Sequence, residues 1–576
     1  MNLLAIHDGH TATACFMRNG AVMALVSEER FTNVKNQSGF PHQALEWIVS
    51  EFCIGLDEMD AIIIPHLVQP IDFAKTFSSH YSYRHLALHV LSHAVPRRVL
   101  GAAKLVDPYV SLFRGYRNGV VRGYCATHGI EPARLHRQEH HAAHRYAALY
   151  GAGYPQRGEA ALVFTLDGSG DGLSGTVARW DPDQGHELLS KRSSYHSLGD
   201  LYSQITQLLG LRPGEHEYKV MGMAPYVRPE HSAPAYAVLC SYMRLNSRGE
   251  VVNDAAFGKA MLARLRRDLR DERFDNIAAA TQRHFEDIVI AWIKHWLTKT
   301  GLNRAAFGGG CFMNARANML IAELPELSEA FFLPSCGDES TALGGAYYLA
   351  ETLGEAVPAP LADLYLGPAH GEDEVVRALE AADSQITTRR IDDIEAAVAK
   401  LLAEGMIVGR FSGRSEWGAR ALGQRSILCR ADSAANVSKL NKAIKMRDFW
   451  MPFAASLLEE NAEQYLYPIA GVTGSYMTMT YKTTPLAQNH LIAGLHPFDH
   501  TCRAQVVSQE TSPSFHRLLT EFKRLTGIGG LLNTSFNLHG APIVGAPATA
   551  LDTLLNSDMD CLALGNYLVT KRKVKK

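Results

Sequence analysis

The chain has 576 residues, enough for two to four domains, and an ordinary globular composition with 47% hydrophobic and 20% charged residues. Lys and Arg number 57 against 59 Asp and Glu, so the formal charge is −2 and the positive field typical of nucleic-acid-binding proteins is missing. Nine scattered cysteines form no Cys-x-x-Cys pair, which argues against a disulfide framework or a zinc module. The start has no signal-peptide pattern, and the most apolar stretch, 86–106, is interrupted by His, Pro and Arg residues. We therefore expect a cytoplasmic protein that binds neither membranes nor nucleic acid.

Three apolar runs with strand character each end in a polar or glycine-rich turn. These turns are Asp8-Gly9-His10, 167–172 and 308–310. The pair Asn19-Gly20, between two further apolar runs, indicates a β-hairpin, and residues 277–297 have apolar side chains near helical spacing. Strands that end in such turns, with helices between them, predict an α/β fold with phosphate-facing loops. Their order resembles that of the nucleotide-binding fold shared by actin, sugar kinases and Hsp70 chaperones.

A proline-rich stretch divides the chain into two predicted domains. Pro358, Pro360 and Pro368 mark it, and strand and helix patterns restart after it. We predict a first domain over residues 1–355, a linker over 356–368 and a second domain over 369–576.

The run His140-His141-Ala142-Ala143-His144 is the sharpest local feature. On a helix, His140 and His144 are four residues apart and share one side, so they can present two imidazoles to one metal, and His136 would lie one turn further back on that side. Such a pair is incomplete without a third ligand from elsewhere. A structural or surface role is an equally open interpretation of the pair alone.

The second predicted domain has a segment rich in basic residues and glycines. The basic residues are Arg410, Arg414, Arg420, Arg425, Arg430, Lys442, Lys445 and Arg447. A solvated basic face is one interpretation, but the mixture with Gly and apolar anchors favours guanidinium groups matched to phosphate oxygens. The segment 532–537 adds amide and hydroxyl groups suited to a small acyl group, or is simply an Asn/Ser-rich turn.

Several motifs in one order resemble a known enzyme family. They are Glu29–Thr32, His140–His144, Lys219–Ala224, Gly308–Asn314, Ser335–Asp338, Ala419–Ser426, Lys445–Phe453 and Leu532–Asn537. The resemblance is to the O-carbamoyltransferases of antibiotic and Nod-factor biosynthesis, the NodU/CmcH family, which includes the tobramycin carbamoyltransferase. It implies an actin-like (ASKHA, Kae1-like) N-terminal domain and a smaller α/β, YrdC-like C-terminal domain. It also implies that carbamoyl phosphate and ATP form carbamoyl-adenylate in the second domain, and that a hydroxyl acceptor takes the carbamoyl group in the first.

The resemblance also assigns the residues of the transfer site. His140, His144 and Asp338 would bind a divalent metal, and two imidazoles with one carboxylate suit Fe²⁺. His10 would act as general base, because an imidazole titrates near neutral pH, and Asp8 would orient it or bind the acceptor.

Two further groups of residues would hold nucleotide and carbamoyl phosphate. Those expected beside the adenylate are Gly168, Ser169, Gly309, Gly310 and Asn314. Those expected on carbamoyl phosphate and the ATP phosphates are Lys35, reaching over from the first domain, and Arg420, Arg425, Lys445, Arg447, Arg503 and Asn533. Met451 and Ser514 stand where relatives have arginines, which removes two possible phosphate contacts.

The acceptor is not readable from the sequence beyond a small molecule or carbohydrate with a hydroxyl group, and oligomers are possible. The aromatic and basic segment 81–124 is a candidate for its pocket, or an ordinary packed helix pair. Three other functions compete: threonylcarbamoyl transfer to tRNA, which the charge of −2 disfavours, hydrogenase maturation, for which we expect Cys-x-x-Cys pairs, and a non-catalytic nucleotide-binding module.

Overall fold

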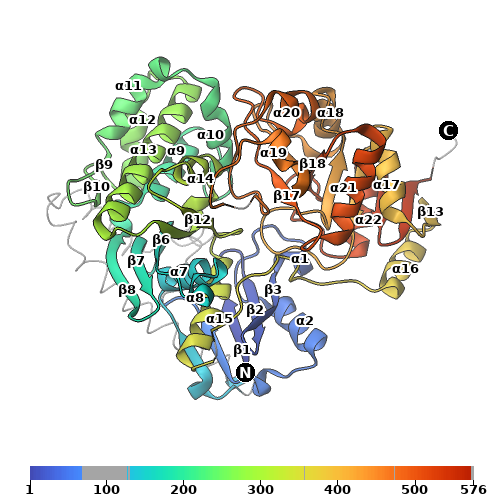
Figure 1. Cartoon of the computed structure of the whole chain (residues 1–576), viewed down its shortest axis with the longest axis horizontal. Helices are drawn as coiled ribbons and strands as arrows, with labels where there is room; N and C mark the ends of the chain where they lie inside the picture. The colour runs from blue at the N-terminus through green and yellow to red at the C-terminus, as the bar shows by residue number, and fades with distance from the viewer. Residues whose placement is uncertain (68–125, 128–129, 356, 473, 573–576) are drawn as a thin grey trace. The chain divides into compact units, whose positions relative to one another are not determined.

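The computed structural model describes residues 1–67, 126–127, 130–355, 357–472 and 474–572 (Figure 1). The segments 81–124 and 86–106 discussed above therefore lie outside the described residues. Two compact units make up the chain: the first contains residues 1–23, 38–313 and 324–361, and the second contains 24–37, 314–323 and 362–576. The units differ from the predicted domains because two short segments of the N-terminal half belong to the second unit. The last crossing, between Leu361 and Ala362, falls inside the predicted linker.

The first unit contains two five-stranded sheets. The first has the order β3-β2-β1-β4-β5 and comprises β1 (Asn2–His7), β2 (Thr13–Arg18), β3 (Ala21–Ser27), β4 (Ala61–Ile64) and β5 (Leu135–Arg137). The second has the order β12-β11-β6-β7-β8 and comprises β6 (Ala161–Gly170), β7 (Leu173–Asp181), β8 (Gly185–Ser193), β11 (Arg304–Gly308) and β12 (Glu329–Phe332). A short ribbon pairs β9 (Met243–Leu245) with β10 (Val251–Asn253).

The two five-stranded sheets repeat one topology. In each, the first strand pairs antiparallel with the second and parallel with the fourth, and the fifth strand lies parallel on the outer side of the fourth. The hairpin predicted at Asn19-Gly20 joins β2 to β3 and is confirmed. This duplicated α/β arrangement is the one expected of an actin-like fold. It also brings the carboxyl ends of the parallel strands β1 and β4 to one edge of the first sheet, and those of β6 and β11 to one edge of the second.

Helices cover the sheets of the first unit. They are α2 (His42–Phe52), α7 (His140–Gly151), α8 (Tyr154–Arg157), α9 (Leu198–Leu208), α10 (Glu217–Met223), α11 (Pro229–Cys240), α12 (Gly258–Asp268), α13 (Phe274–Thr300) and α15 (Ser340–Thr352). The paired helices α7 and α15 connect the two sheets, because α15 packs on β1 and β4 while α7 packs on β6 and β11. The predicted helix 277–297 lies within α13 and is confirmed.

The second unit is built on one mixed sheet of the order β13-β20-β19-β14-β15-β18-β16-β17. Its strands are β13 (Ile386–Arg390), β14 (Val408–Phe411), β15 (Arg425–Cys429), β16 (Ala454–Leu458), β17 (Gln505–Val507), β18 (Gly530–Ser535), β19 (Cys561–Leu564) and β20 (Tyr567–Lys571). Its helices are α1 (Glu29–Thr32), α14 (Ala315–Ala322), α16 (Glu372–Ala381), α17 (Ile394–Ala403), α18 (Ala435–Leu440), α19 (Ala462–Tyr465), α20 (Pro485–His490), α21 (Pro513–Thr526) and α22 (Pro547–Leu555). Across the described part of the chain, no helix combines the length and apolar character needed to span a membrane.

Candidate metal and nucleotide site

Helix α7 begins at His140, because side chains next to its N-terminus cap its first backbone N–H groups. Glu139 accepts hydrogen bonds from the backbone N–H groups of His141 (2.6 Å) and Ala142 (2.9 Å), and Asp171 accepts from the N–H of His140 (2.8 Å). The helix therefore starts at His140, which places His140 and His144 one turn apart on one side. The prediction that His136 extends this side is wrong, because His136 lies in strand β5.

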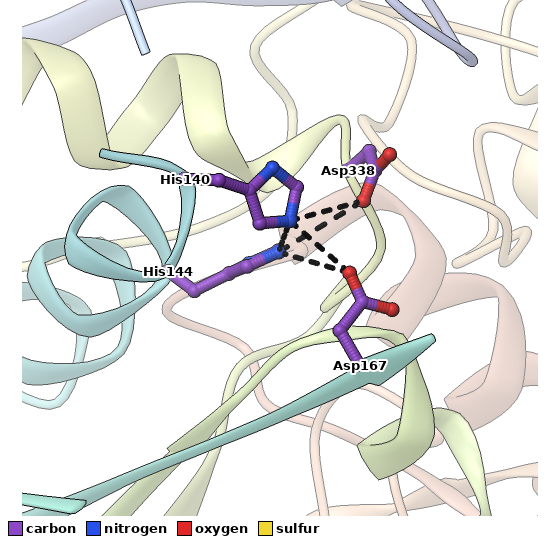
Figure 2. A group of neighbouring side chains, drawn as sticks. All are labelled: His140, His144, Asp167 and Asp338. Atoms are coloured by element: carbon purple, nitrogen blue, oxygen red, sulfur yellow. Dashed lines mark hydrogen bonds and ion pairs between the residues drawn. The ribbon is translucent and has the colours of Figure 1, made fainter. Parts of the chain in front are cut away.

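Four side chains converge at this point of the first unit (Figure 2). His140 Nε2 lies 3.0 Å from His144 Nε2, 3.2 Å from Asp167 Oδ2 and 3.6 Å from Asp338 Oδ1. His144 Nε2 lies 3.6 Å from Asp167 Oδ2 and 3.9 Å from Asp338 Oδ1, and the four ligand atoms are all within 4.8 Å of one another. Both imidazoles are fully buried. The structure thus brings His140, His144 and Asp338 together as predicted.

The donor set fits a divalent transition metal. Two imidazole nitrogens and two carboxylate oxygens face one point, a ligand combination that suits Fe²⁺, Mn²⁺ or Zn²⁺. Like many metal-binding histidines, His144 has its second ring nitrogen fixed from outside, since Nδ1 lies 3.1 Å from Ser340 Oγ at the start of α15.

Proton affinities in the cluster reflect burial and crowding of charge. Burial and the neighbouring Asp167 carboxylate raise the pKa of Asp338 to about 8. Burial alone would lower the pKa of His140, but the carboxylates of Asp338 and Asp167 outweigh it and raise that pKa to about 10. Hydrogen bonds from the two histidines overcome burial at Asp167 and lower its pKa. A metal ion would displace the protons held by His140 and Asp338.

Asp167 is the member of the cluster that the sequence analysis missed. It begins the stretch 167–172 that the sequence predicts to be a turn, although β6 extends to Gly170 with a shift in register after Leu166. Only the following Gly168 and Ser169 were assigned to ligand binding. Its position after the apolar run of β6 was the available signal, because a carboxylate at the end of a central strand faces the catalytic edge of the sheet.

The turn after β1 is held by a pair of buried histidines. His66, at the end of β4, forms an ion pair with Asp8 (Nε2 to Oδ1 2.7 Å), and His7 Nε2 lies 2.8 Å from the carbonyl oxygen of His10. His7 Nδ1 lies 3.0 Å from the hydroxyl of Thr341, which donates to the carbonyl oxygen of Asp338 (2.7 Å). Hydrogen bonds thus link the loop of the predicted base to the loop of a predicted metal ligand, and Asp8 is oriented by His66.

The glycine-rich turns come close to the metal cluster. Gly309 has a φ of +96°, and a Cβ there would lie 2.5 Å from the carbonyl oxygen of Leu166, so glycine is required. A Cβ on Gly310 would lie 3.0 Å from Asp167 Oδ1, whereas one on Gly168 would meet no atom within 4 Å. Ser169 Oγ lies 2.7 Å from Ser194 Oγ.

Asn314 belongs to the second unit. Its side chain accepts a hydrogen bond from the N–H of Ala317 (3.0 Å) and caps α14. Asn314 therefore has a structural role in addition to its predicted contact with the adenylate.

Several predicted phosphate ligands lie in the second unit, with different local roles. Burial lowers the pKa of Arg503, and the nearby cations Arg420 and Arg447 add to the effect. Arg503 Nε finds no hydrogen-bond partner among the described residues. Three mutually repelling guanidinium groups, one of them incompletely hydrogen-bonded, are expected where an anion binds.

Arg425 and Lys445 are already engaged by the protein. The two terminal nitrogens of the buried Arg425 donate to the carbonyl oxygens of residues 412, 424, 368 and 413 at 2.6–3.3 Å. Lys445 Nζ donates to Ser535 O (2.5 Å) and to Asn537 Oδ1 (2.6 Å), and burial, with nearby Arg447, lowers its pKa. These bonds give both side chains a structural role, while Arg425 Nε has no partner among the described residues. The phosphate contacts of Arg425 and Lys445 remain predictions.

Asn533 also lies in a buried network. Its Nδ2 donates to the carbonyl oxygen of Ala421 (3.1 Å) and to Ser456 Oγ (2.9 Å), while its Oδ1 has no partner among the described residues. Ser514 Oγ accepts from Arg410 (2.8 Å), and Met451 is buried, so both are accommodated in local packing.

Lys35 belongs to the second unit and does not reach over from the first. Its segment is anchored there because Leu25 donates to the carbonyl oxygen of Leu366 (3.2 Å) and the Arg30 guanidinium donates to that of Gly418 (2.7 Å). The Lys35 side chain itself is exposed.

Two family models and several curated proteins are similar to this chain. The family described as Carbamoyltransferase N-terminus matches residues 3–347, and Carbamoyltransferase C-terminus matches residues 399–571. Nodulation protein NolNO of Sinorhizobium fredii is 30% identical over 98% of this chain and 79% of its own length. Nodulation protein NolO of Bradyrhizobium diazoefficiens is 33% identical over 75% of this chain and 79% of its own length. A crystal structure of full-length HypF in a phosphate- and nucleotide-bound form aligns with a TM-score of 0.32 at 10% identity, over 62% of this chain and 56% of that one. The chain belongs to the NodU/CmcH-like carbamoyltransferase family.

Proposed function

We propose that the protein is an ATP-dependent O-carbamoyltransferase. Carbamoyl phosphate, water and ATP would give carbamoyl-adenylate, phosphate and pyrophosphate, and an acceptor hydroxyl would then take the carbamoyl group and release AMP. The acceptor is a small molecule or carbohydrate of natural-product biosynthesis. The observation that carries the proposal is the convergence of two buried histidines and two aspartates beside the glycine-rich turns of a carbamoyltransferase-family chain.

In this proposal the first unit performs the transfer. His140, His144, Asp167 and Asp338 would hold a divalent ion, with Fe²⁺ as our first choice, and this ion would supply positive charge to the phosphate of the adenylate as it leaves. His10 would accept the proton of the acceptor hydroxyl, and Asp8, held by His66, would orient that hydroxyl.

The second unit would perform the activation. Arg420, Arg447 and Arg503 provide the positive charge for carbamoyl phosphate and the ATP phosphates, and Lys445 and Asn533 would shape the floor of this site. We assign to this unit the YrdC-like fold that the family resemblance implies. A labile adenylate explains why both activities occur in one chain, since its release would lose the carbamoyl group to water.

The two half-reactions can be tested separately. Purified protein with ATP, carbamoyl phosphate and Fe²⁺ should release pyrophosphate and form carbamoyl-adenylate, detected by mass spectrometry. His144→Asn should keep pyrophosphate release but lose metal binding and transfer to a pooled set of hydroxylated acceptors. Arg503→Met should lose pyrophosphate release and keep metal binding.

Matched controls are His42→Asn and Arg524→Met, which change exposed side chains on α2 and α21 and should behave as wild type. Folded, metal-loaded protein that forms neither pyrophosphate nor adenylate, with or without the acceptor pool, would disprove the proposed activity.

A further inference from the structure

One buried cation of the first unit has no use in the scheme above. Arg192, near the end of β8, is 8% exposed, and its guanidinium carbon lies 4.5 Å from the ring centre of Trp292 on α13. Among the described residues, its Nη1 is enclosed without a hydrogen-bond partner, and no carboxylate contributes to its electrostatic surroundings. Buried arginines are normally paired, because an uncompensated charge in the interior costs several kcal/mol.

The electrostatic surroundings of Arg192 do not compensate the charge. Burial lowers the pKa of Arg192 to about 10, and the one ionisable group that counteracts this is the thiol of Cys311. Burial keeps that thiol neutral, since it raises the pKa of Cys311 well above its usual value. His196, the other titratable neighbour, has its pKa lowered by burial and by Arg192 and is therefore also neutral at pH 7. The charge at Arg192 is unmatched within the described protein.

The strand register places Arg192 level with the end of the apolar run of β6, on the face opposite to the one from which Asp167 reaches the histidines of α7. Arg192 pairs with Gly175 of β7, which pairs with Leu166 of β6, the residue before Asp167. The guanidinium extends back over the sheet, because its Nη1 lies 3.6 Å from the point that a Cβ of Gly175 would occupy. It therefore lies about one strand spacing, roughly 5 Å, from β6.

The adenylate loops occupy the same side of the sheet. Thr176, next to Gly175, turns to the opposite side, where it bonds Arg145 of α7, so Gly175 and Arg192 face α9 and α13. On that side a Cβ of Gly309 would touch the carbonyl of Leu166, and a Cβ of Gly199 would lie 3.0 Å from Cys311 Sγ and 2.9 Å from Gly168 Cα. The first turn of α9, which is 11 residues long, thus lies against Cys311 and the Gly168 turn.

We propose that Arg192 binds the phosphate group of the nucleotide in the first unit, with the adenosine held by the Gly168 and Gly309 turns. This assignment deepens the proposed function and rests on it. A bound phosphate would provide both the counter-charge and the hydrogen-bond acceptors that the guanidinium lacks. Without nucleotide the buried charge is a stability cost that binding removes.

The test compares AMP with adenosine, which differ only in the phosphate. Binding to the full chain is measured by calorimetry for wild type, Arg192→Met, Arg192→Lys and the control Arg179→Met, which removes a half-exposed arginine from the neighbouring strand. We expect wild type and the control to prefer AMP. In Arg192→Met the AMP affinity should fall about 10- to 100-fold, the size of a charge-assisted hydrogen bond, while the adenosine affinity stays unchanged. Arg192→Lys should lie between.

The melting temperature gives a second test, because it should not fall in the variant whose AMP affinity falls. Because Arg192→Met removes an unpaired buried charge, the melting temperature without nucleotide should stay level or rise, while the stabilisation by AMP is lost. A full AMP preference in Arg192→Met or Arg192→Lys, or a lower stability that AMP restores as in wild type, would overturn the assignment.

Two further outcomes distinguish a wrong role for Arg192 from a wrong ligand and from a wrong proposed function. If inorganic phosphate alone stabilises wild type as well as AMP does, but not Arg192→Met, the site is one for free phosphate and the nucleotide assignment is wrong. If wild-type protein binds neither AMP nor adenosine, the proposed function fails rather than the role of Arg192.

Discussion

Replacing Gly344 by alanine should disrupt the metal cluster from a distance. Gly344 lies on α15, where a Cβ would be 2.6 Å from the carbonyl carbon of Ala143 on α7 and closer still to its oxygen. Carbon atoms in contact are separated by about 3.5 Å or more, so the two helices must move apart by about 1 Å. Alanine favours a helix over glycine by about 1 kcal/mol, but overpacking against a rigid backbone costs about 3 kcal/mol, so we expect a net destabilisation of about 2 kcal/mol.

Moving α7 and α15 apart would shift metal ligands that are positioned by each of the two helices. His144 follows Ala143 on α7, and Asp338 lies two residues before the start of α15. Metal–ligand distances tolerate changes of about 0.2 Å, so a 1 Å shift should weaken metal binding by at least about 10- to 100-fold. Anaerobic calorimetry with Fe²⁺ or Mn²⁺ and thermal melting measure the two effects. Gly371→Ala, whose methyl group would meet no atom within 4 Å, is the control. Wild-type metal affinity in Gly344→Ala would refute the close packing of α7 and α15 as the support of this site.

Three further predictions concern protonation, structure and nucleotide binding. In the metal-free protein, the raised pKa values of about 10 for His140 and about 8 for Asp338 mean that this pair holds at least one proton at pH 7. Metal affinity should therefore rise about tenfold per pH unit between pH 6 and 8, and a flat calorimetric profile would contradict this. Arg425→Met leaves several buried carbonyl groups without donors and should cost at least about 3 kcal/mol, seen as faster hydrogen exchange of residues 412–424; unchanged exchange would show that these bonds are dispensable. Gly309→Ala must hold alanine at a φ of +96°, at a cost of about 1–2 kcal/mol, and its methyl group would also overlap the Leu166 carbonyl, which adds about 1–3 kcal/mol. It should weaken AMP binding more than metal binding, and equal losses would indicate a general collapse of the site.

Local periodicity was sufficient to predict part of the metal cluster. The four-residue spacing of His140 and His144 defines their relative position once a helix forms, and the structure confirms the helix. The same reasoning failed for His136, because Glu139 and Asp171 cap the helix at His140 and the chain before it is strand β5. A spacing rule applies only within the helix, and the helix start depended on capping contacts that spacing does not encode.

The sequence analysis identified only one of the two aspartates that lie near His140 and His144 in the structure. Asp338 lies 194 residues from His144, and the family resemblance, not its spacing, connected the two. Asp167 went unassigned because an aspartate before a glycine is an ordinary turn former, and its role depends on where strand β6 ends relative to α7. The fold converts these distant turns into one site through the repeated strand order of the two sheets.

The sequence alone does not distinguish arginines with a structural role from arginines that bind a ligand. Arg425, Arg503 and Arg192 are all buried guanidinium groups, yet only the first has its charge distributed over backbone carbonyl oxygens. Arg503 repels two neighbouring cations and lacks one hydrogen bond, and Arg192 has only a neutral thiol, a neutral imidazole and an aromatic ring around it. Because an interior charge is costly unless it is paired, we propose that ligands supply the missing partners of Arg503 and Arg192. An unpaired nitrogen alone does not make this distinction, because Nε of Arg425 also lacks a partner among the described residues. Arg425 differs in that both of its terminal nitrogens donate to carbonyl oxygens. In this proposal each unit has its own anion site, with Arg503 in the second unit and Arg192 in the first.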